Sequence, residues 1–387
     1  MLLTSLLLAC SAAPAPLVVQ EDDKMPDVNS AVRRAVAALV EMQEGDDSAE
    51  WPYEGVYRVP VYTEGLKARN EIPMGYRVGG TSIVANALTQ APGYEEDADR
   101  QGAVARAVDF VTGAVRHDLM DPEYGGGYDV RGWGYVYAIE FLVGLQRDDR
   151  VPKGMDGKIK KAVQFYLDGL EKLEIPGSGG WSYSRRGPLD QVSPTSPFMT
   201  GPALQALFSA KAQGYGVSRK MVDRALDGLE RGLVDTGEVI YSSNEGQAPR
   251  GGQLPGSVGR MLVTETTLHL GGRGSISRVR GAIDAFLVHW EWLDKRRAQN
   301  GTHIKPYGVA PYYFYYAHVY AAQAIEQLPE AEREEYRRRL RQKLFEVQVD
   351  GGLWNDRVFE RTANYGTACA VHALVMPNAV RPATWGN

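Results

Sequence analysis

The feature that most constrains this chain is a unit that recurs six times, roughly every 45–60 residues. Each unit begins with an amphipathic helix, continues through a loop rich in Gly and aromatic residues, and ends in a helix rich in Ala, Gly and Leu. The first helices are predicted at Ala31–Gln43, Ala103–Val115, Lys158–Leu173, Met221–Val234, Val279–Leu293 and Glu335–Gln348, and the second at Gly75–Leu88, Tyr135–Gln146, the end of Gly179–Leu207, Ser257–Leu270, Tyr312–Leu328 and Asn364–Met376.

The two kinds of helix predict how the units assemble. The first helix of each pair carries charge on one face, so one side meets water. The second is nearly uncharged and contains many small residues, so it is enclosed on all sides and allows close helix contacts. We therefore predict an all-α fold, an (α/α)6 toroid of six helix pairs and about twelve helices. An open helical array is the alternative, but it would leave one face of the second helices exposed.

Two loops carry a phrase that identifies a related fold. Gly179-Gly180-Trp181-Ser182-Tyr183 is one copy, and Val349-Asp350-Gly351-Gly352-Leu353-Trp354, leading to Asn364-Tyr365-Gly366-Thr367-Ala368, is the other. They resemble the squalene-cyclase/protein-prenyltransferase repeat of the terpenoid cyclase/prenyltransferase toroids, over most of Asn29–Ala379. The resemblance implies that this chain is a divergent, bacterial lipoprotein-like member of that group. It is evidence for the fold and not for the reaction.

The residues that such proteins use for chemistry are missing from the matching places. The sequence has no Asp-x-Asp-Asp motif for alkene protonation and no Cys-Gly-Glu-Gln thioester segment. The position that resembles the prenyltransferase zinc-ligand His is Gly366. Cys369 and His372 share a helix face, but two residues are too few for a zinc site and also suit a buried core. No cofactor or metal is expected, and whether the chain is an enzyme stays open.

The N-terminal residues predict export. Met1–Ala9 is a short apolar run that ends at Cys10, as in a bacterial lipoprotein signal, and residues 11–28 would be a flexible tether. A toroid domain would cover 29–379 and a tail 380–387. We expect anchoring to the cell envelope through a lipid on Cys10, with a secreted or periplasmic soluble protein as the alternative. The net charge of −5 gives no basic field for nucleic acid.

Loops that enter the second helices should gather at one end of a toroid around a central cavity. Glu140 and Glu265 lie inside second helices, where a buried carboxyl is costly unless it is paired or functional, so they are the candidates for acid/base catalysis. The residues expected at the cavity, as ligand contacts, are Tyr128, Asp129, Trp133, Trp181, Tyr183, His303, Tyr312, Tyr316, His318, Trp354, Asp356 and Tyr365. For Trp181 and Trp354, which belong to the repeated motif, a structural role is favoured, in which each attaches its loop to the neighbouring helix pair.

Three functions fit these residues. A binding or scaffold protein with an aromatic cavity for an isoprenoid-like or other hydrophobic small molecule is the first. A terpenoid-cyclase-like or prenyl-transferring enzyme without the usual motifs is the second. The third is an (α/α)6 carbohydrate-active enzyme, which requires two cavity carboxylates at a separation of roughly 5–10 Å.

Overall fold

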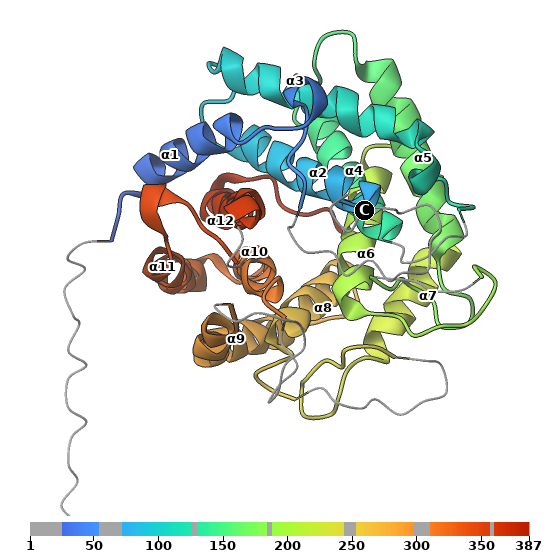
Figure 1. Ribbon diagram of the computed structural model, residues 1–387. Helices are drawn as coiled ribbons and strands as arrows, with labels where there is room; N and C mark the ends of the chain where they lie inside the picture. Colours follow the sequence, from blue (N-terminus) through green and yellow to red (C-terminus); the bar gives the residue numbers. More distant parts are fainter. Residues whose placement is uncertain are drawn as a thin grey trace, which may run out of the picture.

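The fold is a ring of helix pairs. The computed structural model describes residues 25–53, 72–124, 130–183, 188–243, 253–297, 310–356 and 360–386, and each internal gap precedes one of the inner helices. These residues contain twelve α-helices, short 3-10 turns and isolated β-bridges (Figure 1). The outer helices are α1 (Val28–Glu41), α3 (Ala98–Gly113), α5 (Asp156–Leu173), α7 (Arg219–Glu230), α9 (Ile276–Arg297) and α11 (Glu330–Glu346). The inner helices are α2 (Met74–Gln90), α4 (Arg131–Arg147), α6 (Pro197–Ala212), α8 (Val258–Leu270), α10 (Tyr313–Ile325) and α12 (Ala363–Val375).

The ring is closed. Each inner helix packs against the next along the chain, and α12 packs against both α2 and α1. The predicted toroid is therefore confirmed and the open array is excluded. Outer helices bury one face: α5, for example, buries Ile159, Val163, Tyr166 and Leu170 while its charged residues face outward. Inner helices such as α4 and α12 are buried almost all round, as their uncharged sequences predict.

Glycine permits the closest helix contact in the ring, between α2 and α4. A Cβ on Gly75 would lie 2.6 Å from the Val130 carbonyl oxygen, and one on Gly134 would lie 2.8 Å from the Gly75 carbonyl oxygen. A Cβ on Gly79 would enter the ring of Trp133, at 2.2 Å. These contacts explain why an inner helix tolerates residues that weaken isolated helices.

The repeated Gly/aromatic loop motif forms the same local structure in three loops, which we call the Trp staple. A loop Trp donates its backbone N–H to a Thr hydroxyl on the following inner helix and its indole N–H to a carbonyl of the preceding outer helix. The donor–acceptor distances are 2.9 and 2.7 Å for Trp51 with Thr81 and Leu39, 3.0 and 2.8 Å for Trp181 with Thr200 and Leu170, and 3.0 and 2.8 Å for Trp354 with Thr367 and Leu344.

The staple decides between the two roles that the sequence allows for Trp181 and Trp354. Their exposed fractions are 2% and 0%, and neither residue lines the described cavity, so the structural role holds and the ligand contact does not. An indole whose N–H is already satisfied by a helix carbonyl joins the two helices of its own pair, and it has no donor left for a ligand.

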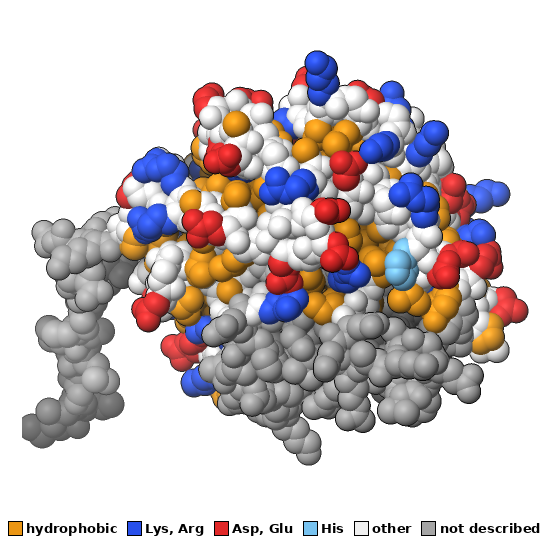
Figure 2. All heavy atoms as spheres, turned by 45° about the horizontal axis from the view of Figure 1, so that its top comes forward, with side chains coloured by type: hydrophobic (Ala, Val, Ile, Leu, Met, Phe, Trp, Pro, Cys, Tyr) orange, Lys and Arg blue, Asp and Glu red, His pale blue; other side chains and the backbone are white. Residues whose placement is uncertain are grey.

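The face of the molecule in Figure 2 shows no large patch of one charge among the described residues. On the face in Figure 2, acidic and basic side chains alternate, with apolar atoms in small patches between them. None of the described helices combines the length and apolar character needed to cross a membrane. Cys10 and the predicted tether lie outside the described residues, so the lipid anchor stays a prediction.

Candidate functional site

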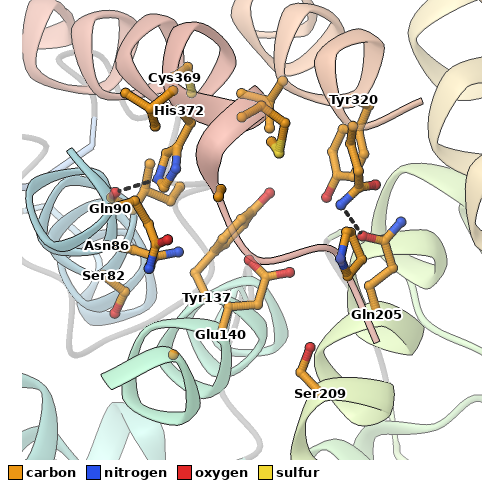
Figure 3. A pocket seen from close by; sticks show the side chains of 18 of the residues that line it. Ser82, Asn86, Gln90, Tyr137, Glu140, Gln205, Ser209, Tyr320, Cys369 and His372 are labelled. Carbon is orange, nitrogen blue, oxygen red and sulfur yellow. Dashed lines mark hydrogen bonds between the residues drawn. The ribbon is translucent and has the colours of Figure 1, made fainter. Parts of the chain in front are cut away.

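A cavity of about 150 Å³ lies among the C-terminal halves of the inner helices. Helices α2, α4, α6, α10 and α12 form its wall, and the segment that follows α12 crosses it (Figure 3). The polar and aromatic residues that line it are Ser82, Asn86, Gln90, Tyr137, Glu140, Arg147, Gln205, Ser209, Tyr316, Tyr320, Gln323, Tyr365, Cys369 and His372. The sequence predicted a central cavity at the end where the loops enter the inner helices. The cavity that the described residues form is at the opposite end, and their contribution to the entry end is a cluster of contacting aromatic side chains.

Glu140 is the one carboxyl group on the described wall of this cavity. It lies on α4, one turn after Tyr137, and Figure 3 shows its carboxyl group beside that phenol. The group is partly accessible through the cavity, yet protein surrounds it. Loss of hydration disfavours the charged form, so burial raises the pKa of Glu140 from 4.5 to about 8. The side chain is therefore mostly protonated at neutral pH.

The nearest cation on the wall does not offset this cost. Arg147 lies two turns further along α4, but its guanidinium makes two bonds to Asp148, at 2.7 and 2.8 Å. Gln90 donates to the same carboxylate at 2.7 Å. The charges at the rim therefore neutralise each other, and the interior around Glu140 presents neutral groups.

The remaining polar groups are held by hydrogen bonds. His372 donates Nε2–H to the Ile83 carbonyl, at 3.2 Å. Burial lowers the pKa of His372 to about 4, so its ring is neutral and its other nitrogen is an acceptor. On the other side, Gln323 donates to Gln205 at 2.7 Å and Gln205 donates to Thr267 at 2.9 Å. These contacts give the cavity several fixed, uncharged hydrogen-bonding groups.

Aromatic side chains close the inner end of the cavity and form what we call the aromatic floor, made of Tyr53, Tyr76, Trp133, Tyr183, Phe198 and Tyr312. Their rings contact one another across the toroid, with centroids 5.8 Å apart for Tyr53–Tyr76, 6.1 Å for Tyr76–Tyr183 and 6.0 Å for Tyr183–Tyr312. The hydroxyl of Tyr183 also donates to that of Tyr76, at 2.5 Å.

Two tyrosines connect the floor to the cavity wall. The ring centroids are 4.5 Å apart for Tyr316 and Phe198 and 4.6 Å apart for Tyr365 and Tyr53. Of the predicted cavity aromatics, Tyr316 and Tyr365 thus line the cavity. Tyr183, Tyr312 and Trp133 belong to the floor, and Trp133 lies on the first turn of α4 instead of in a loop.

Glu265 has a different environment from Glu140. It lies on α8, away from the cavity wall, and Arg278 of α9 holds it with contacts of 2.9 Å. Of the two acid/base candidates, Glu140 thus lines the cavity and Glu265 does not. A carboxylate that an arginine from the outer helix neutralises is part of the packing between α8 and α9. Desolvation still raises its pKa, although Arg278 opposes that shift.

His318 and Asp356 also lie away from the cavity wall. Nε2 of His318 accepts the indole N–H of Trp290 at 2.9 Å, and its Nδ1–H donates to the Phe314 carbonyl at 2.7 Å. Both ring nitrogens are used, and burial lowers its pKa to about 4, so His318 joins α10 to α9. Asp356 is fully buried, and its charge adds to burial in raising the pKa of the Cys369 thiol.

The other predicted positions, Tyr128, Asp129, His303 and Cys10, lie outside the described residues. Within the described ranges, no three His, Cys, Asp or Glu side chains are grouped as a metal site. Cys369 and His372 both line the cavity, one turn apart on α12.

Sequence reasoning missed most of the polar cavity wall, although a signal was present. Ser82, Asn86 and Gln90 are four residues apart along α2 and form a polar stripe on one face of this helix. Gln205 and Ser209 repeat this spacing on α6. Side chains four apart share one face of a helix. The stripes begin in the middle of the inner helices, whereas the sequence analysis concentrated on the loops before them.

Solved structures with the same fold include carbohydrate enzymes and a terpene cyclase. The GH76A α-1,6-mannanase from Salegentibacter sp. HEL1_6 is 12% identical, with a TM-score of 0.56 over 90% of this chain and 100% of the mannanase. The unsaturated glucuronyl hydrolase from Streptococcus agalactiae is 13% identical, with a TM-score of 0.56 over 91% of this chain and 92% of the hydrolase. The type II terpene cyclase MstE from Scytonema, solved as a variant with its substrate, is 14% identical, with a TM-score of 0.51 over 91% and 98% of the two chains.

No protein-family model and no curated protein sequence matches the chain. At such low identities the shared feature is the fold. The chain thus has an (α/α)6 toroid fold, which it shares with a mannanase, a glucuronyl hydrolase and a terpene cyclase.

Proposed function

We propose that this protein is carbohydrate-active: the cavity binds one end of an uncharged, hydroxyl-rich molecule, and Glu140 exchanges a proton with a ligand oxygen. The observation that carries the proposal is the unpaired Glu140 carboxyl, whose pKa of about 8 keeps it protonated but able to ionise near neutral pH. Structures with the same fold that act on carbohydrates, the mannanase and the glucuronyl hydrolase, support the class of ligand.

The surrounding groups suit such a ligand. Amides of Asn86, Gln90 and Gln205 and the hydroxyl of Ser209 both donate and accept, as sugar hydroxyls do. Phenol rings of Tyr316 and Tyr365 supply apolar surface for a sugar ring. A cavity of about 150 Å³ is below the 300–1,000 Å³ of sites that enclose drug-sized ligands, so we expect it to take a single sugar unit.

The described wall does not favour the usual mechanism of glycoside hydrolysis. That mechanism uses two carboxyl groups on either side of the bond, and the described cavity wall has Glu140 alone. We therefore limit the chemical proposal to proton transfer by Glu140.

A second candidate is an isoprenoid ligand, which the aromatic floor and the toroid shared with the terpene cyclase favour. It ranks second for two reasons. The cavity is too small for a long isoprenoid chain. A carboxyl with a pKa of about 8 is also a weak acid for protonating an alkene.

The test uses three proteins, the wild type, Glu140→Gln and Glu265→Gln. Binding of neutral mono- and disaccharides, including α-1,6-linked mannobiose, is measured by saturation-transfer NMR, and product formation by chromatography. We expect binding by the wild type and by Glu265→Gln, and a change in affinity or turnover confined to Glu140→Gln.

Two results would contradict the proposal. The first is no binding across the sugar panel together with a stoichiometric lipid in an organic-solvent extract, which would favour the isoprenoid candidate. The second is equal behaviour of the two variants, which would exclude a role for Glu140.

A further inference from the structure

The segment that follows α12 crosses the cavity and narrows its opening on the side opposite the aromatic floor (Figure 3). Met376, Ala379, Val380 and Pro382 of this segment line the cavity. It continues to Trp385, which reaches the far side of the ring, and Figure 1 shows the labelled C-terminal end in front of the inner helices. We call residues Met376–Trp385 the strap.

Trp385 anchors the strap at its far end. Its backbone N–H donates to the Leu270 carbonyl at the end of α8, at 2.9 Å. Its ring packs on Phe208 of α6, with centroids 5.5 Å apart, and the ammonium of Lys211 lies 4.1 Å from the ring centroid. The strap therefore begins on α12 and is fixed again on α6 and α8, with the cavity between these points.

Between its two ends the strap is weakly held. Residues 380–383 make no hydrogen bond to the described helices, and Val380 is 53% exposed although it also lines the cavity. Segments with few buried contacts and few hydrogen bonds open locally at a small fraction of the free energy of global unfolding. By contrast, the described residues on the other side of the cavity hold one another through ring contacts and through the Tyr183–Tyr76 hydrogen bond of the aromatic floor.

We infer that the strap is the entrance of the cavity and that release of Trp385 from Phe208 and Lys211 is the step that opens it. Ligands enter by displacing residues 379–385, past the ends of α6 and α8. While the strap is in place, Val380 and Pro382 form the part of the cavity wall that an entering ligand contacts first. This inference concerns access and holds for any ligand of the cavity.

Cys369 provides the test, because it lines the cavity, is 4% exposed and is the only cysteine besides Cys10. In the full chain carrying Cys10→Ser, the rate of alkylation by iodoacetamide reports how often the cavity opens. Trp385→Ala should raise this rate at least about tenfold, since it removes the anchor of the strap. Lys211→Met, which removes one contact of the same ring, should raise it by less.

Trp292→Ala is the matched control, because Trp292 is 40% exposed on α9 and does not line the cavity. Its alkylation rate should equal that of the parent. The rates are measured again in low urea: opening of the strap changes them little, whereas global unfolding raises them steeply.

A chain that ends at Asn378 removes most of the strap without replacing an aromatic residue, and it should react as fast as Trp385→Ala or faster. The inference is overturned if both changes leave the rate at the parent value. It is also overturned if the rate follows global unfolding in urea.

Discussion

The two ends of the toroid are built from the same helices but by opposite rules. At the end where loops enter the inner helices, each Trp staple pairs its indole N–H with a helix carbonyl, and Tyr183 and Tyr76 of the aromatic floor pair their hydroxyls. At the other end, the inner helices present polar groups to a cavity, and Glu140 has no partner in the described structure. The first end holds the ring together, and the second carries the site.

The two buried glutamates show what makes this difference. Both interrupt apolar inner helices, and both have a pKa raised by burial. Glu265 forms an ion pair with Arg278 of the adjacent outer helix, whereas Glu140 lies among phenol side chains and faces the cavity. A buried acid therefore indicates a site only when the neighbouring elements leave it unpaired, which depends on the tertiary structure.

Removing a staple should have the largest effect on stability. Trp354→Ala deletes a fully buried indole and leaves the Leu344 carbonyl without its donor, so we expect a loss of about 3–5 kcal/mol in the free energy of unfolding. Urea denaturation followed by circular dichroism measures this loss. Trp292→Ala, at a half-exposed site, should cost less than about 1 kcal/mol. Similar losses for the two variants would remove the structural role of the staple.

The cavity end should instead affect how the free energy of unfolding depends on pH. Glu140 binds its proton more tightly in the folded state, with a pKa of about 8, than in the unfolded chain, at 4.5. The wild type therefore loses stability as the pH rises through this window, by about 1.4 kcal/mol per pH unit. Relative to Glu140→Gln, the loss should reach about 3 kcal/mol between pH 5 and pH 7.5.

Comparing unfolding free energies of these two proteins at each pH cancels the titration of His318 and His372, which both retain. Parallel stability curves for wild type and Glu140→Gln would show that the carboxyl group is better solvated, or paired, and would contradict our description of the cavity.

The Glu265 region should respond to loss of its partner. Arg278→Met leaves the Glu265 carboxylate buried without a cation, and because Arg278 is 43% exposed we expect only about 1–2 kcal/mol of destabilisation. Arg280→Met is a control two residues away on α9: its pair with Glu332 is 34% exposed on both sides, so the cost should be below about 0.5 kcal/mol. Equal effects in urea denaturation would mean that the Arg278–Glu265 pair behaves like a surface contact.

The same comparison shows how much of the fold and of the candidate site could be predicted from the sequence. The six helix pairs were predicted because the spacing of apolar residues and the Gly/aromatic loops are local signals; α5, for example, was predicted to end at Leu173, where it ends. The Trp staples were visible as a repeated phrase, although their hydrogen bonds were not. The location of the cavity was not predictable, because its wall combines side chains from five helices that are far apart along the chain, α2, α4, α6, α10 and α12.

The partner of each buried side chain was equally hidden. Arg278 lies 13 residues after Glu265 in the next helix, although Arg260 is nearer to Glu265 along the chain. Arg260 instead donates to the carbonyls of Val239 and Gly256. Which arginine reaches a carboxylate depends on how the outer helix is rotated against the inner one. That rotation cannot be inferred from a single sequence.

The central claim is that Glu140 is an unpaired carboxyl group inside a neutral cavity, and its own titration tests this most directly. In protein labelled with ¹³C at the glutamate carboxyl groups, the resonance of Glu140 is assigned by its absence from Glu140→Gln and followed with pH. We predict a midpoint of about 8. A midpoint near the ordinary value of 4.5 would contradict the account, because it would mean that Glu140 is hydrated or paired like a surface residue.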